Sequence, residues 1–222
     1  MTPLAQRFAN EVVLAPKDRT LVDPDGILRL MPDASCFEMT EVADVVSNFG
    51  NAYIDAGVPD PKLAFLPHRL TWLEWMPTEP GPDGKRRRGF MLEDSGDDFA
   101  IIWYLGPQGA RIVGKMALGN RLEEAMDDRT VPFIAYPHDN PQLDERKVTV
   151  WAFILYGMLA VINSPRQIGR RTHTAHSGLA RKLAKAKMLG KPGPLRPWTE
   201  IKLEWMPEAE DDQAPKESRL TG

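Results

Sequence analysis

Four short segments in the middle of the chain decide its fold: RLTWLEWM at residues 69–76, RRGFMLE at 87–93, FAIIWYL at 99–105 and ARIVGKM at 110–116. Each is rich in aromatic or β-branched residues, which favour β-strands. Turn-forming clusters separate them: Pro82-Asp83-Gly84, Asp94-Ser95-Gly96-Asp97 and Gly106-Pro107-Gln108-Gly109. Glycine adopts positive φ and proline presets φ for a turn, so these clusters reverse the chain direction. The sequence therefore predicts a four-stranded antiparallel meander.

Residues 148–162, VTVWAFILYGMLAVI, form the most apolar run of the chain. The run is apolar on every helical face, which is typical of a buried helix. It is also shorter than the roughly 20 residues needed to cross a bilayer, so we expect a core helix rather than a membrane span. Asn163, Ser164 and Pro165 should end it, because proline lacks an amide proton and disfavours helical geometry in the preceding residue.

Three further elements are expected. Ser35 and Glu38 have capping-box spacing and predict a helix that runs to about Phe49. A second, amphipathic helix should extend from Gly178 to Leu189, and a late strand from Thr199 to Trp205. The predicted fold class is α+β: a mainly antiparallel sheet, made of the meander and the late C-terminal strand, packed against the buried apolar helix.

The domain prediction is a single α+β domain over residues 1–207, with a basic segment at 163–197. Residues 208–222 are acidic and almost without large apolar side chains, so we expect a flexible tail.

The single cysteine, Cys36, excludes an intrachain disulfide and a cysteine-rich zinc module, which favours a reducing compartment. Residues near Met1 lack the apolar stretch of a secretion signal. We therefore expect a cytoplasmic protein.

Charge is segregated along the chain. No acidic residue lies between Arg146 and Thr199, although the chain contains 31 acidic and 28 basic residues. Eleven of the basic residues fall in that stretch, which leaves 31 acidic against 17 basic residues elsewhere. Grouped like charges raise the local potential and favour partners of opposite charge. The stretch therefore predicts a surface for nucleic acid or for an acidic protein, although a solvated basic face is the simpler alternative.

Six basic residues are the candidate nucleic-acid contacts: Arg166, Arg170, Arg171, Arg181, Lys182 and Lys185. The first three are expected in a loop, and the last three on the face of the 178–189 helix that lies opposite its apolar stripe. Lysine and arginine neutralise phosphates, and a cluster of them is the usual mark of nucleic-acid binding. The run from Lys85 to Arg88 lies at a predicted hairpin and is a candidate extension of this surface.

Other chemical motifs are weak. His173 and His176 would share a helical face, but two ligands do not make a metal site, and we expect exposed loop histidines. Asp94 and its neighbours Asp97 and Asp98 favour a hydrated turn over a cation site. The chain contains no nucleophile elbow, no phosphate-binding glycine loop and no zinc-protease motif. We predict no catalytic residue, metal site or cofactor.

The pentapeptide LEWMP occurs twice, at residues 73–77 and 203–207. A match this short is far below the period of a repeat architecture, so coincidence or shared strand-end chemistry explains it most simply. The functional alternative is a docking surface made by the equivalent tryptophan and methionine side chains on one sheet face. That alternative requires the two tryptophans to be exposed.

Four features follow one another in the C-terminal quarter: Ile162-Asn163-Ser164-Pro165-Arg166, a predicted basic helix, Gly190-Lys191-Pro192 and the predicted strand from Trp198 to Trp205. In this layout the quarter resembles a family of uncharacterised phage and prophage proteins. Gly193 stands where the family pattern has a second proline. The resemblance implies a cytoplasmic setting in a bacterium or a phage-infected host, implies no known activity and transfers no catalytic residue.

The leading functional hypothesis is a non-enzymatic accessory protein of phage or prophage type. It would contact nucleic acid, or a nucleic-acid-handling complex, through the six basic residues. One alternative is a protein-binding inhibitor or structural component that uses its acidic surface against a basic partner. Another is an enzyme whose site assembles only in three dimensions. The sequence indicates no oligomeric state.

Overall fold

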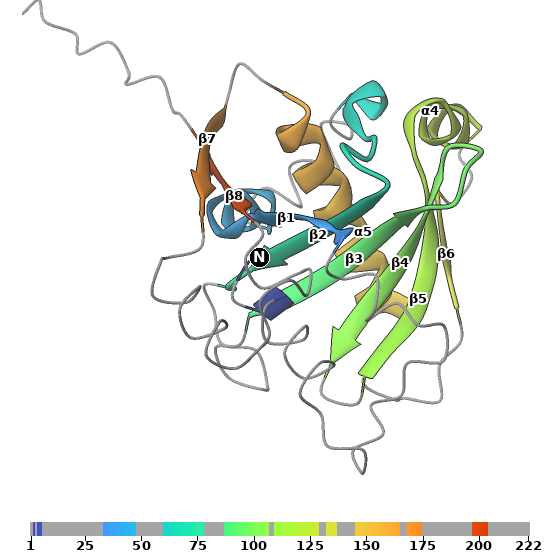
Figure 1. Ribbon diagram of the computed structural model, residues 1–222. Coiled ribbons are helices and arrows are strands. Elements are labelled where there is room, and N and C mark those ends of the chain that lie inside the picture. Colours follow the sequence, from blue (N-terminus) through green and yellow to red (C-terminus); the bar gives the residue numbers. More distant parts are fainter. Residues whose placement is uncertain are drawn as a thin grey trace, which may run out of the picture.

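The computed structural model in Figure 1 describes residues 2, 4–5, 33–47, 60–77, 87–106, 109–128, 132–136, 145–164, 168–174 and 197–203. Its frame is an eight-stranded sheet with the order β6-β5-β4-β3-β2-β1-β8-β7. The strands are β1 (Ser35–Glu38), β2 (Leu70–Trp75), β3 (Arg88–Asp94), β4 (Phe99–Gly106), β5 (Gly109–Ala117), β6 (Phe133–Ala135), β7 (Ile168–His173) and β8 (Trp198–Leu203). The helices are η2 (Pro61–Leu63), α4 (Gly119–Asp127) and α5 (Glu145–Ile162), and residues 40–47 are also helical. The predicted α+β class is confirmed.

Strands β2 to β5 form the predicted antiparallel meander, and a register shift between Ile102 and Trp103 interrupts the β4–β5 pair. The late strand β8 belongs to the same sheet, as expected. It reaches the meander through β1, which lies between β8 and β2 and is parallel to both.

The predicted capping box at Ser35 is wrong. Ser35–Glu38 is strand β1, in which Cys36 and Phe37 are buried between neighbouring strands. The helix begins only at Thr40, whose amide nitrogen lies 3.3 Å from the Glu38 carboxylate. Glu38 thus supplies the acceptor at the helix start from the end of a strand, because burial of Cys36 and Phe37 outweighs the local capping pattern.

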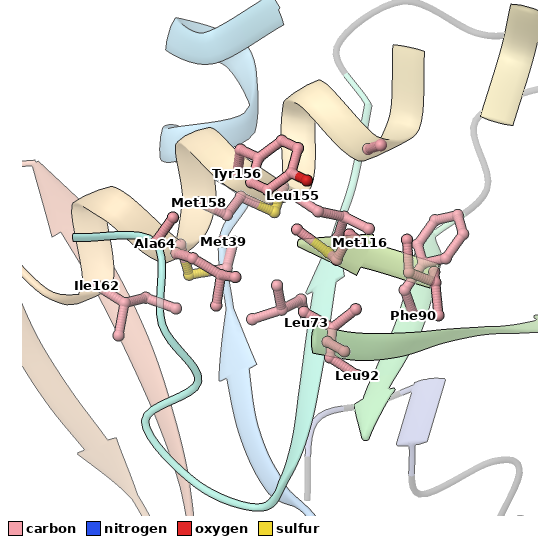
Figure 2. Packing of buried hydrophobic residues seen from close by; sticks show 14 of the residues in the cluster. Met39, Ala64, Leu73, Phe90, Leu92, Met116, Leu155, Tyr156, Met158 and Ile162 are labelled. Carbon is pink, nitrogen blue, oxygen red and sulfur yellow. The ribbon is translucent and has the colours of Figure 1, made fainter. Parts of the chain in front are cut away.

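Helix α5 packs on one face of the sheet, as Figure 2 shows. Leu155 and Leu159 are fully buried, and the facing strands contribute Leu73, Phe90 and Leu92. The helix ends at Ile162, as predicted. None of the helices in the described ranges is long and apolar enough to span a membrane.

The expectation that the apolar run is buried on every side is wrong for its first half. Val150 is 57% exposed and Phe153 41% exposed. Burial is continuous from Leu155 to Ala160, and the helix at residues 40–47 contacts this part of α5 through Val46. A side chain on Gly157 would come within 2.7 Å of Val46, so glycine permits this close approach.

The opposite face of the sheet carries a smaller apolar cluster. Trp72, Met91 and Trp103 are buried there, together with Ala5 from the start of the chain. A Cβ on Gly89 would lie 2.1 Å from the Trp72 ring, so the absence of a side chain makes room for the tryptophan. This second face also carries the polar groups of the candidate site.

Candidate functional site

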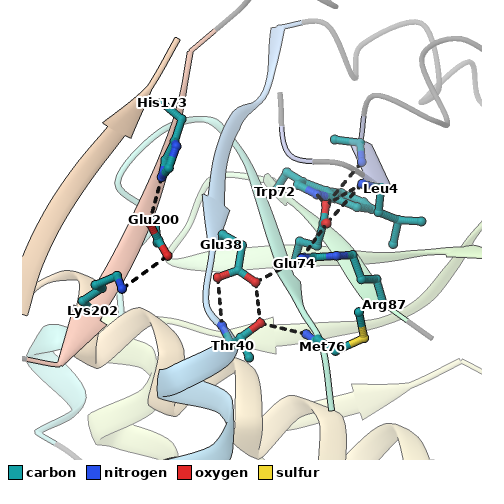
Figure 3. Close-up of polar contacts among 11 residues, drawn as sticks. Leu4, Glu38, Thr40, Trp72, Glu74, Met76, Arg87, His173, Glu200 and Lys202 are labelled. Carbon is teal, nitrogen blue, oxygen red and sulfur yellow. Dashed lines mark hydrogen bonds and ion pairs between the residues drawn. The ribbon is translucent and has the colours of Figure 1, made fainter. Parts of the chain in front are cut away.

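Three glutamates lie side by side on the face opposite α5. Strand register pairs Glu38 of β1 with Glu200 of β8 on one side and with Glu74 of β2 on the other. Neighbouring strands are about 4.8 Å apart, so the carboxylates would repel one another unless each had its own partners. Figure 3 shows that each of them has such partners.

Glu74 is fully buried and surrounded by donors. Its carboxylate accepts from the backbone nitrogen of Leu4 at 3.1 Å, from that of Ala5 at 3.3 Å and from Trp72 Nε1 at 3.1 Å. Arg87 Nη1 lies 3.2 Å from Glu74 and 3.1 Å from Glu38. These contacts occupy the carboxylate and join the chain start to β2 and β3, so we assign Glu74 a structural role.

Arg87 is therefore turned toward the buried glutamates and is not an addition to the predicted basic surface. Of the Lys85 to Arg88 run, Arg88 lies in β3, and Lys85 and Arg86 lie outside the described residues.

The docking interpretation of the LEWMP repeat fails at its first copy, because Trp75 is buried and stacks on Phe90. Trp205, in the second copy, lies outside the described residues.

Glu200 lies at the outer end of the glutamate row and pairs with a histidine. His173 Nε2 is 2.7 Å from Glu200 Oε2. The hydrogen bond from His173 holds the pKa of Glu200 below its usual value, with smaller contributions from Lys202 and Arg171. Ionised Glu200 therefore stabilises the fold above the ordinary carboxyl pKa, and this contribution is lost as the pH falls through the lowered value.

The prediction of exposed loop histidines is wrong for His173. It lies in β7, and 29% of its side chain is exposed. Its ring stacks on that of Trp198 with centroids 3.9 Å apart and planes at 7°. This contact could not be predicted from the sequence, because the two residues are brought together only by the pairing of strands β7 and β8. His176 lies outside the described residues.

Arg170 and Arg171 also lie in β7, not in a loop as predicted. Successive strand residues point to opposite faces, so these two arginines diverge. Arg170 Nη2 donates to the carbonyl of Ile162 at 2.6 Å, where its charge complements the C-terminal end of α5. Arg171 is exposed on the face that carries Glu200. The other four candidates lie outside the described residues: Arg166, Arg181, Lys182 and Lys185.

A third cation, Lys202, joins these two arginines. A shallow depression of about 420 Å³ is lined by Glu41, Gly169, Arg170, Arg171, Lys202 and Leu203. Lys202 Nζ lies 3.6 Å from Glu41 and 3.7 Å from Glu200. Lys202 is not among the contacts predicted from the sequence, because it lies just after the stretch from Arg146 to Thr199 that contains no acidic residue. We call Arg170, Arg171 and Lys202 the basic edge, since they lie on β7, the last strand of the sheet, and on its neighbour β8.

The three aspartates at the β3–β4 turn form a hairpin tip, as predicted. Asp94 Oδ1 accepts from the amide of Gly96 at 2.9 Å, and Asp97 and Asp98 have positive φ values of 54° and 58°. Asp tolerates this conformation in turns better than most residues. In the part of the chain that the structure describes, no three His, Cys, Asp or Glu side chains are placed to hold a metal ion.

The chain matches no protein-family model, and no curated protein or solved structure is significantly similar to it. The residues of the site are therefore the basis for assigning a function.

Proposed function

We propose that this chain is a non-enzymatic accessory protein of phage or prophage type that contacts nucleic acid, or a nucleic-acid-handling complex, in the cytoplasm. The contact surface is the basic edge, extended in sequence by Arg166, Arg181, Lys182 and Lys185. One observation carries the proposal: Arg170, Arg171 and Lys202 gather around one open depression on a chain that is acidic outside its basic segment.

The local charge balance supports an anionic ligand. Lys202 pairs with both Glu41 and Glu200, but only Glu41 lines the depression together with the three cations of the basic edge, so cations outnumber carboxylates in its lining. Arg171 is exposed, and no ion pair of its guanidinium shorter than 4 Å is found among the described residues. A phosphate that approaches Arg171 and Lys202 releases bound counterions, which favours binding. Contacts of this kind position a nucleic-acid backbone without reading bases.

The test is a binding titration with labelled DNA and RNA at low salt. We expect Arg171→Ser and Lys202→Ser each to weaken binding by a similar factor for every sequence, because each removes a phosphate contact. Lys62→Ser and Arg121→Ser are matched controls, since these exposed cations also pair with carboxylates, those of Glu123 and Glu124. Absence of binding by the wild type, or equal losses in test and control variants, would refute the proposal.

A second candidate function is binding of a basic protein through the acidic surface. The exposed aspartates of the β3–β4 tip favour it, because they line a depression of about 290 Å³ beside the exposed ring of Phe65. If the wild type binds no nucleic acid but captures a basic protein, and Asp97→Asn weakens that capture, this second function replaces the first. Asn is the suitable substitution because it also tolerates positive φ.

A further inference from the structure

The basic edge carries a pair of stacked rings on the same sheet face as Arg171. His173 and Trp198 are directly paired across β7 and β8, and both side chains are partly exposed. Trp198 also packs against the buried cluster that contains Trp72 and Cys36. His173 is fixed from a second direction by Glu200, at 2.7 Å. The two rings are therefore held in one orientation before any ligand arrives.

We propose that the His173–Trp198 pair stacks an unpaired nucleobase, so that the ligand of the basic edge is single-stranded nucleic acid. This inference rests on the proposed function. Side chains two residues apart on a strand share a face, which places Arg171 beside His173. On β8, the same alternation places Lys202 on the face that carries Glu200 and Trp198. A base on the rings and its phosphates at Arg171 and Lys202 can then be bound together.

Ring stacking distinguishes this ligand from a duplex. In a duplex both faces of each base are covered by neighbouring bases, so stacking on a protein ring first requires unstacking. Single strands expose these faces, and proteins that bind them combine a cationic groove with aromatic side chains. Cations alone would give no such preference, because a duplex carries the denser phosphates. The fixed rings beside the basic edge therefore favour the single strand.

The experiment measures anisotropy with three labelled probes of equal length: a single-stranded DNA, a DNA duplex, and an abasic single strand that has the same phosphates and sugars but no bases. We expect the single strand to bind at least about fivefold more tightly than the abasic strand, the factor that corresponds to the lower end of base–aromatic stacking energies. Equal binding of all three probes would overturn the stacking proposal and leave the proposed function standing. Binding of none would overturn both.

Variants of His173 test whether the preference for the single strand over the abasic strand comes from the stacked rings. His173→Phe keeps an aromatic ring on Trp198 and should retain the preference for the single strand over the abasic strand. His173→Leu should abolish that preference. Both variants lose the hydrogen bond to Glu200, so His173→Phe and His173→Leu should bind the abasic strand equally well, and the difference between them isolates the ring. Tyr136→Leu is the matched control, because Tyr136 is an exposed aromatic residue that follows β6 at the other edge of the sheet. If His173→Leu keeps the full preference, the rings do not bind the base.

Discussion

Glu74 illustrates how single residues hold this fold together. Its buried carboxylate accepts from the chain start, from Trp72 and from Arg87, which come from different parts of the sequence. A buried charge is costly unless it is paired and hydrogen-bonded, and here both conditions are met. The start of the chain is therefore tied to the sheet by a charge in addition to apolar packing.

We expect Glu74→Ala to lower the free energy of unfolding by roughly 3–5 kcal/mol, because it leaves Arg87 partly unpaired and removes the acceptor of two backbone amides. Urea denaturation measures the change. Glu124→Ala is the control, since Glu124 belongs to an exposed pair with Arg121 and should cost at most about 1 kcal/mol. Equal losses in the two variants would show that the Glu74 network does not stabilise the fold.

At the same scale, the sequence identified candidate residues but not their surroundings. Arg170 and Arg171 are candidates because of their charge, yet the sequence does not show that both are exposed on a strand and that only Arg170 is bonded to the end of α5. The contacts of His173 with Trp198 and Glu200 could not be predicted from the sequence either, because they depend on the register between β7 and β8. The spacing of residues along the sequence does not predict which of them come into contact across neighbouring strands.

At the scale of elements, the meander and α5 were predicted because their patterns are local. Strands β2 to β5 are short, apolar and joined by glycine-rich turns, and α5 is a long apolar run that ends before Pro165. Strand β7 was missed because its sequence, IGRRTH, is polar and basic. It lies at the edge of the sheet, where charged residues are tolerated and discourage pairing with other chains.

Strand β1 was missed for a different reason. Its four residues carry a capping-box pattern that is also compatible with a helix start, and its two partners lie far away in sequence, in β2 and β8. Parallel pairing with such distant strands depends on the whole fold. The local pattern therefore gave the wrong element at Ser35, although a helix does follow from Thr40.

Helix α5 should contribute strongly to stability through its second half. Replacing the fully buried Leu155 with Ala should cost roughly 2–5 kcal/mol, as expected for a large-to-small change in a packed core. Phe153→Ala is the control, because Phe153 is 41% exposed and its truncation should cost less. Thermal or urea denaturation compares the two. A larger loss for Phe153→Ala than for Leu155→Ala would contradict the packing of α5 described above.

At the scale of the whole molecule, the basic edge and the exposed aspartates occupy different sites on the surface. The row of glutamates runs across β2, β1 and β8 on one sheet face, where Arg87, His173 and Lys202 partner it. The basic edge lies at the end of the same sheet, and the aspartates of the β3–β4 tip are exposed at another site. Such separation attracts ligands of opposite sign to defined parts of the surface.

The salt dependence of binding tests the central claim most directly, namely that the basic edge binds the phosphates of a single-stranded nucleic acid. If Arg171 and Lys202 each neutralise one phosphate, the logarithm of the association constant should fall with the logarithm of salt concentration with a slope of about −1.4 or steeper. The slope should become shallower by about 0.7 in Arg171→Ser and remain unchanged in Arg121→Ser. A wild-type affinity that does not change with salt, or the same slope in all three proteins, would contradict the claim.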